Sequence, residues 1–127
     1  MVCCMKLVLS ALPKTWILDV DGTLVKHNGY LLDGEDELLE GVSEFFENIS
    51  DNDLVILLTA RDEAYVPQLK KLMSKRGLRF DYVITNAPHG ERILINDNKP
   101  SGLNTAFAIN KIRDAKMEID VEIDQNL

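Results

Sequence analysis

Two aspartates separated by one residue, Asp19 and Asp21, follow an apolar run and precede a Gly-Thr turn. A charge at the end of an apolar run departs from the pattern of a buried strand, and burying an unpaired carboxylate costs several kcal/mol. We therefore expect this pair at the carboxyl end of a strand, facing a cation, a reactant or water. Because a carboxylate is ionised at neutral pH, Asp19 could attack phosphorus without an activating base. Asp21 could then act as general acid and afterwards as general base.

Other predicted strands also end in polar residues. A second buried strand ends at Thr59, and a fourth predicted strand ends at Asp97. Since ligands of parallel sheets bind at the carboxyl ends of the strands, we expect these residues to converge on the Asp19 pair. The Asp19 carboxylate, the Asp21 backbone carbonyl and the Asp97 carboxylate, completed by water and substrate, would suit the octahedral oxygen coordination of Mg2+.

Small and hydroxyl-bearing residues beside the aspartates suit a phosphate ligand. Gly22 allows close approach of the backbone, and Thr23 and Thr59 supply hydroxyl donors. Together with the acids, these residues have the composition of a phosphoryl-transfer site, in which the protein mainly supplies positioning and charge compensation.

The elements that must position these residues alternate between strand and helix patterns, which predicts an α/β fold with a mainly parallel sheet and helices on both faces. One helix has its apolar stripe between residues 38 and 49, and another begins near Pro67 and stops before Gly77. A third helix is predicted after Ser101. The predicted strands are residues 16–19, 54–58, 82–84, 93–95 and a final, strictly alternating strand at 117–123.

Three segments outside this alternation complete the predicted organisation. The run Val25–Leu32 contains Asn28-Gly29, a strong hairpin signal, and predicts a small flap beside Asp19. Residues 1–14 read as a tail or an extra strand, and residues 15–127 as a single domain. The final strand either closes a sheet edge or pairs with another subunit in a homo-oligomer.

Composition narrows the classes of partner. The 127 residues are 46% hydrophobic and 28% charged, and the formal net charge is -7. An acidic protein repels nucleic-acid backbones and anionic lipid surfaces, so a nucleic acid is a disfavoured partner and no membrane is expected. The adjacent Cys3 and Cys4 make no disulfide framework, which favours a reducing, cytoplasmic location.

The motif Asp19-Val20-Asp21-Gly22-Thr23-Leu24 resembles the first motif of the haloacid dehalogenase (HAD) superfamily of phosphohydrolases. The segments 57–61 and 95–97 are similar to the second and fourth motifs of that superfamily. The resemblance implies a Rossmann-like three-layer sandwich, dependence on Mg2+, and an aspartyl-phosphate intermediate with Asp19 as nucleophile and Asp21 as acid/base.

The chain departs from the superfamily pattern at two places. Members have a phosphate-binding Lys or Arg in a third motif, yet no lysine occurs between Lys75 and Lys99. Lys99 or Arg92 would have to replace it. The fourth motif commonly carries a second acid, whereas Asp97 lies between two asparagines.

The predicted domain has no room for the cap that usually selects the substrate in this superfamily. Together with a similarity of segments 88–92 and 99–102 to short HAD proteins of polysaccharide and nucleotide-sugar biosynthesis, this favours a phosphatase acting on a small sugar or polyol phosphate. Two alternatives remain open. One is a polynucleotide end phosphatase, and the other is a binding or regulatory module with the same fold and weak catalysis.

Overall fold

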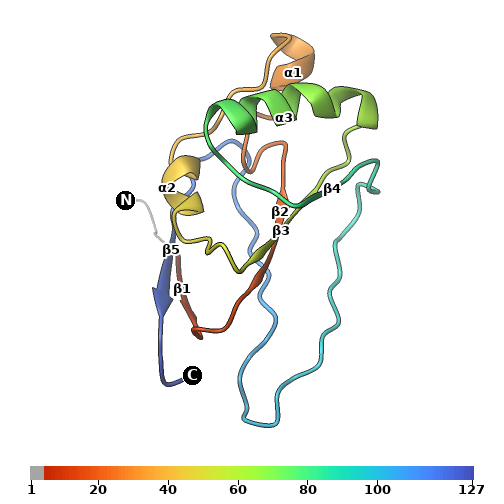
Figure 1. The fold of residues 1–127 in the computed structure, drawn as a ribbon. Coiled ribbons are helices and arrows are strands. Elements are labelled where there is room, and N and C mark those ends of the chain that lie inside the picture. Colours follow the sequence, from red (N-terminus) through yellow and green to blue (C-terminus); the bar gives the residue numbers. More distant parts are fainter. Residues whose placement is uncertain (1–4) are drawn as a thin grey trace.

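The computed structural model describes residues 5–127, so Cys3 and Cys4 lie outside the described residues. The strands form two small parallel sheets. One sheet joins β1 (Met5–Leu9) to β5 (Ile119–Ile123), and the other has the order β2 (Thr15–Asp19), β3 (Leu54–Leu58), β4 (Tyr82–Ile84). The α-helices labelled in Figure 1 are α1 (Gly29–Leu32), α2 (Val42–Phe46) and α3 (Val66–Lys75). A 3-10 turn, η1 (Glu63–Tyr65), directly precedes α3.

The core lies on one face of the three-stranded sheet. In register, Trp16 pairs with Val55 and Leu18 with Leu57, and all four side chains are buried. The Trp16 ring also meets Phe45 of α2 edge to face, with centroids 5.6 Å apart. From α3, Leu69 and Met73 are fully buried in the same cluster. Because each fully buried side chain of this size contributes about 1.5–3 kcal/mol, this face holds β2 and β3 against both helices.

The opposite face of the same sheet bears exposed apolar residues: Ile17 on β2 and both Tyr82 and Ile84 on β4. Within residues 5–127, helices therefore cover one face. The mixed α/β class and the parallel strands are confirmed, whereas the expected third layer is not formed by the described residues.

The predicted fourth strand and the helix after Ser101 are both wrong. In Figure 1 the chain after β4 runs as a long irregular loop to the lower end of the molecule and back. Ile93 and Ile95 are 82% and 92% exposed, so the three-residue apolar run finds no neighbouring strand that would pair with it. Gly102 has a φ of 88°, a left-handed conformation that interrupts a helix in its first turn.

The predicted hairpin flap is also wrong. Asn28 does adopt the left-handed conformation that such a turn requires, with φ of 57°. The chain then continues as the short helix α1, in which the Leu32 N–H donates to the Asn28 carbonyl at 3.0 Å. The segment 25–36, called the flap below, therefore contains a short helix in place of a hairpin.

Two predicted helices agree with the structure to different extents. The predicted end of α3 is confirmed, because Lys75 is its last residue and Gly77 follows with φ of 68°. The other helix, α2, begins only at Val42. Gly41 precedes it with φ of 86°, and a Cβ at that position would collide with the Met117 carbonyl. The apolar residues before Gly41 thus pack against the core without being helical.

The final strand is confirmed as β5, with exposed Asp120 and Glu122 alternating with half-buried Ile119 and Val121. Its partner is β1, with Met5 opposite Ile119. The segment before residue 15 thus contains an extra strand, which joins the beginning of the described chain to its end.

Asp53, which precedes β3, is expected to be a major contributor to stability. Its carboxylate accepts hydrogen bonds from the Trp16 Nε1 and from the backbone N–H groups of Lys14 and Ser50, at 2.9, 2.9 and 3.0 Å. Burial raises the pKa of Asp53, but these bonds outweigh burial and hold the pKa below its usual value of 3.8. Replacing Asp53 by Ala should lower the free energy of unfolding by about 2–4 kcal/mol at neutral pH, because one buried and two part-buried donors lose a charged acceptor.

Because the folded-state pKa is depressed, this contribution is present above the unfolded-state pKa and is lost as the pH falls through the folded-state pKa. Urea unfolding followed by the fluorescence of Trp16, the single tryptophan, measures it at about pH 7 and about pH 3. The difference in the free energy of unfolding between wild type and Asp53→Ala should be smaller at the lower pH. Asp51→Ala, at an exposed neighbouring position, is the matched control, and an equal loss in both variants would contradict this role for Asp53.

Candidate active site

The turn after β2 holds the two aspartates in place. Asp19 is the last residue of β2, and the backbone then folds back so that the Leu24 N–H donates to the Val20 carbonyl at 2.9 Å. Val20 and Leu24 are fully buried and anchor the turn in the core. Gly22 has a φ of 85°, which a residue with a side chain rarely adopts. The position of Asp19 and Asp21 at the carboxyl end of a strand is as predicted.

The Asp19 carboxylate has a hydrogen-bond partner on each oxygen. The Thr23 hydroxyl donates to Oδ2, and the Arg92 Nη1 donates to Oδ1, both at 2.9 Å. The side chain is nevertheless 39% exposed, so an incoming ligand can reach the carboxylate from solvent. Arg92, one of the two candidates for the missing basic group, thus lies at the predicted nucleophile.

The Asp21 carboxylate is more enclosed than that of Asp19. The Thr59 hydroxyl donates to its Oδ2 at 3.4 Å, and the Arg61 Nη2 donates to its Oδ1 at 2.7 Å. Thr59 directly follows β3, and its hydroxyl also accepts from the Arg61 backbone N–H at 3.0 Å. The predicted approach of Thr59 to the aspartate pair is therefore present, through Asp21.

Arg61 is a site residue that the sequence interpretation did not assign, although it lies in the second motif. Its side chain is fully buried, and its terminal nitrogens also donate to both Asp36 oxygens at 2.8 and 2.9 Å. The Tyr30 ring lies over the guanidinium, 3.9 Å from the carbon to the ring centroid. Burial lowers the pKa of Arg61, but the hydrogen bonds and charges of Asp36 and Asp21 outweigh it and raise the pKa above its usual value.

The sequence does contain a signal for Arg61, because a basic residue shortly after a strand can reach acidic residues at the end of the neighbouring strand. No comparable signal exists for Asp36, which lies in an acidic run that reads as the solvated first turn of a helix.

Lys111 and Asp114 brace the same turn from the end of the long loop. The Lys111 ammonium donates to the carbonyls of Gly22 and Ala115, and the Asp114 N–H donates to the Gly22 carbonyl at 2.9 Å. The Asp114 carboxylate accepts from the His27 N–H at 2.7 Å. Burial lowers the pKa of Lys111. These contacts connect the turn that carries Asp19 and Asp21 to a segment almost ninety positions later, which no local sequence pattern indicates.

Two predicted site residues are not brought to this turn. Asp97 and Lys99 are exposed in the long loop, where the Asp97 carbonyl accepts from the Thr105 hydroxyl and the Lys99 carbonyl accepts from the Gly102 N–H. The strand that should have carried Asp97 to the aspartate pair does not form, and within residues 5–127 no hydrogen bond or ion pair joins Asp97 to that pair.

This arrangement fits Mg2+ poorly. Over residues 5–127, no group of three or more acidic, histidine or cysteine side chains could hold a metal ion. Asp97 is outside the site. One carboxylate oxygen of Asp19 accepts a hydrogen bond from the Arg92 guanidinium, and one of Asp21 accepts a hydrogen bond from the Arg61 guanidinium.

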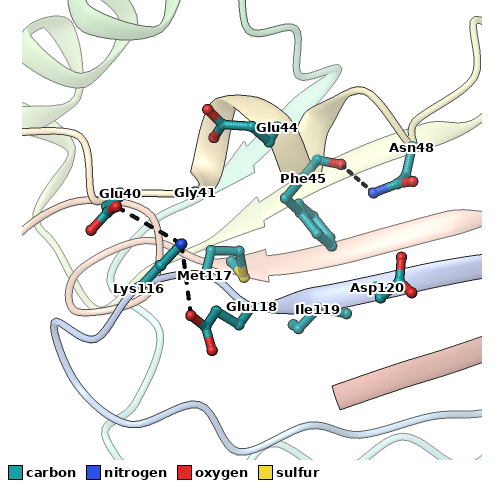
Figure 2. A pocket seen from close by; sticks show the side chains of 10 residues that line it. All are labelled: Glu40, Gly41, Glu44, Phe45, Asn48, Lys116, Met117, Glu118, Ile119 and Asp120. Carbon is teal, nitrogen blue, oxygen red and sulfur yellow. Dashed lines mark hydrogen bonds and ion pairs between the residues drawn. The ribbon is translucent and has the colours of Figure 1, made fainter. Parts of the chain in front are cut away.

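A cavity of about 710 Å³ lies between α2 and the chain leading into β5 (Figure 2). Its base includes the buried Phe45 and Met117, while Glu40 and Glu118 lie near Lys116 at 3.9 and 3.8 Å. It contains none of the predicted site residues, so it is separate from the aspartate pair.

No protein-family model, curated protein or solved structure matches this chain. Among the helices of the described residues, none is long and apolar enough to span a membrane.

Proposed function

We propose that this protein is a HAD-type phosphomonoester hydrolase that works through an aspartyl-phosphate on Asp19. The observation that carries the proposal is the Asp19 carboxylate itself. It is solvent-accessible at the end of β2, a strand with one buried face, with a hydroxyl and a guanidinium at 2.9 Å and the Asp21 carboxylate two residues away. The motif resemblance and the parallel strands support the same reading, including the Rossmann-like arrangement that the resemblance implies. The adjacent Cys3 and Cys4 favour a cytoplasmic location.

In the first step, an Asp19 oxygen forms a bond to phosphorus as the bond from phosphorus to the ester oxygen breaks. The leaving oxygen keeps the electron pair of that bond and takes a proton from the Asp21 carboxyl, so that the alcohol departs neutral. The enzyme then holds a mixed anhydride of Asp19 and phosphate, and Asp21 is ionised.

In the second step, water attacks the phosphorus of the anhydride and gives a proton to the Asp21 carboxylate. The bond from phosphorus to the Asp19 oxygen breaks, and its electron pair restores the carboxylate. Inorganic phosphate leaves, and Asp21 is again protonated for the next cycle.

Positive charge for both steps comes from Arg92. A guanidinium presents paired donors that match phosphate oxygens, and in the free site this group already neutralises Asp19 at 2.9 Å. On binding, Arg92 can move its hydrogen bonds from the carboxylate to the phosphate, which also frees the nucleophile. The Thr23 hydroxyl holds the other Asp19 oxygen in position.

The substrate class follows from charge and access. Between β2 and β3 the structure contains only the flap, α2 and their connections, so no cap domain covers the site within the described residues. The net charge of -7 disfavours a polynucleotide. We propose a small sugar or polyol phosphate, and we keep dependence on Mg2+ as a prediction to be tested.

One feature favours a second candidate, a binding or regulatory module with weak catalysis. Both aspartates are paired with arginines, and Asp97 lies outside the site. Such a module would bind a phosphorylated ligand without hydrolysing it.

A panel of phosphomonoesters separates these functions. The purified protein is incubated with sugar phosphates, polyol phosphates, nucleotides and a phosphorylated oligonucleotide, each with added Mg2+ and with a chelator, and inorganic phosphate is measured. We expect release from the sugar or polyol phosphates, and the two metal arms decide the cofactor. Binding without release would favour the module, and hydrolysis of the oligonucleotide alone would overturn the proposed substrate class.

A further inference from the structure

We infer that Asp36 is a positioning residue that holds Arg61, and through Arg61 fixes the Asp21 carboxylate that protonates the leaving group. This inference rests on the proposed function for its kinetic consequence, while the underlying contact can be tested without it. Asp36 lies in the flap and belongs to no motif. Its sequence context predicts a side chain exposed to solvent.

The contact between Asp36 and Arg61 has the geometry of a fixed pair. Arg61 donates two parallel hydrogen bonds to Asp36, at 2.8 and 2.9 Å, and both side chains are completely buried. Such a paired arrangement restricts the guanidinium in direction as well as in distance. The Tyr65 carbonyl accepts a further bond from Nη1 at 3.1 Å.

The remaining terminal donor of Arg61 is thereby directed at the acid/base residue. Nη2 donates both to Asp36 at 2.8 Å and to Asp21 at 2.7 Å, so one nitrogen joins the two carboxylates. With every terminal donor engaged, Arg61 cannot turn without breaking a buried charged hydrogen bond. Asp36, a residue of the flap, therefore determines the position of the Asp21 carboxylate through Arg61.

An aromatic pair closes the guanidinium on one face. Tyr30 of α1 lies 3.9 Å from Arg61 and packs against Tyr65, with ring centroids 4.9 Å apart. A cation held against an aromatic face in a desolvated setting is stabilised in that position. Asp36 and Tyr30, both in the flap, thus hold the same group by independent contacts.

The consequence is a dependence on the leaving group. An alkoxide leaving group needs a proton from Asp21, whereas p-nitrophenolate leaves readily without one. Displacing Asp21 should therefore slow the first step, phosphorylation of Asp19, much more for an alkyl phosphate than for p-nitrophenyl phosphate, whereas the second step, in which Asp21 acts as base, is slowed equally for both. A loss of folded protein would instead lower both rates by the same factor, so the ratio of the two rates reports position and is insensitive to stability.

The test compares Asp36→Asn with wild type on both substrates. At saturating substrate, we expect the rate constant for leaving-group release in the first turnover to fall about 10- to 100-fold for the alkyl phosphate and less than about threefold for p-nitrophenyl phosphate, with KM changed less than about threefold. Asp33→Asn is the matched control, since Asp33 is an exposed flap acid that lies 3.7 Å from Lys26. An equal fall for both substrates would overturn the inference.

Two further arms keep the test decisive. If Asp36→Asn does not fold, Tyr30→Leu keeps the ion pairs and should shift the same rate ratio in the same direction, by a smaller factor; an unchanged ratio would count against the inference.

Nitrogen-15 NMR of the Arg61 guanidinium tests the contact independently of catalysis. It should show separate, slowly exchanging Nη protons in wild type and Asp33→Asn, and averaged Nη signals in Asp36→Asn. Averaged signals in wild type would overturn the positioning role. Separate signals in a protein without hydrolysis would overturn only the proposed function.

Discussion

Replacing Asp19 by Asn is expected to reduce the release of phosphate from every substrate of the protein by at least about 10³-fold. The amide keeps the size of the carboxylate and can still accept the hydrogen bond from Arg92, but it cannot form the covalent phosphoryl intermediate. Binding should persist, because Arg92 and the hydroxyl of Thr23 are unchanged. The measurement is phosphate release together with trapping of the phosphorylated enzyme from labelled substrate by acid quenching.

Wild type should carry the label in a form that hydroxylamine releases, as expected of a carboxyl-bound phosphate, and Asp19→Asn should carry none. Asp51→Asn, at an exposed position remote in sequence, serves as the control for the added amide. Trp16 fluorescence in urea establishes that the variant is folded. Hydrolysis that survives in Asp19→Asn would exclude the covalent mechanism.

The part of this site that could be predicted from sequence is the part encoded locally. The end of β2 at Asp19, the turn at Gly22 and the position of Thr59 after β3 depend on a few consecutive residues and on the rule that parallel strands end at one edge. The end of α3 before Gly77 was predictable for the same reason.

The rest depends on contacts between distant segments. Arg92 reaches Asp19 across 73 positions, and Asp36 meets Arg61 across 25, without any periodicity that links them. The predicted strand at 93–95 failed because a three-residue apolar run becomes a strand only beside a partner edge. Without that strand, Asp97 and Lys99 remain in the loop. Arg92, which directly precedes the predicted strand, does reach Asp19.

The arginine arrangement also bears on the choice between enzyme and binding module. Asp21 shares Arg61 with Asp36, so the guanidinium carries one positive charge between two carboxylates. Asp19 is instead paired with Arg92, which no second carboxylate shares within residues 5–127. The two aspartates therefore have different electrostatic surroundings, as the separate roles proposed for them require.

Replacing Asp21 by Asn is expected to lower steady-state turnover by about 10²- to 10⁴-fold, the usual contribution of general acid/base catalysis. The fold should be retained, because Arg61 keeps its paired bonds to the buried Asp36. The two chemical steps should respond differently. With p-nitrophenyl phosphate the first step needs no proton, so Asp19 is still phosphorylated, whereas water then lacks its base. Rapid-quench measurements should therefore show a burst of p-nitrophenolate of about one equivalent per enzyme followed by slow turnover. Turnover close to wild type would contradict the role of Asp21, and slow turnover without a burst would assign it to the first step alone.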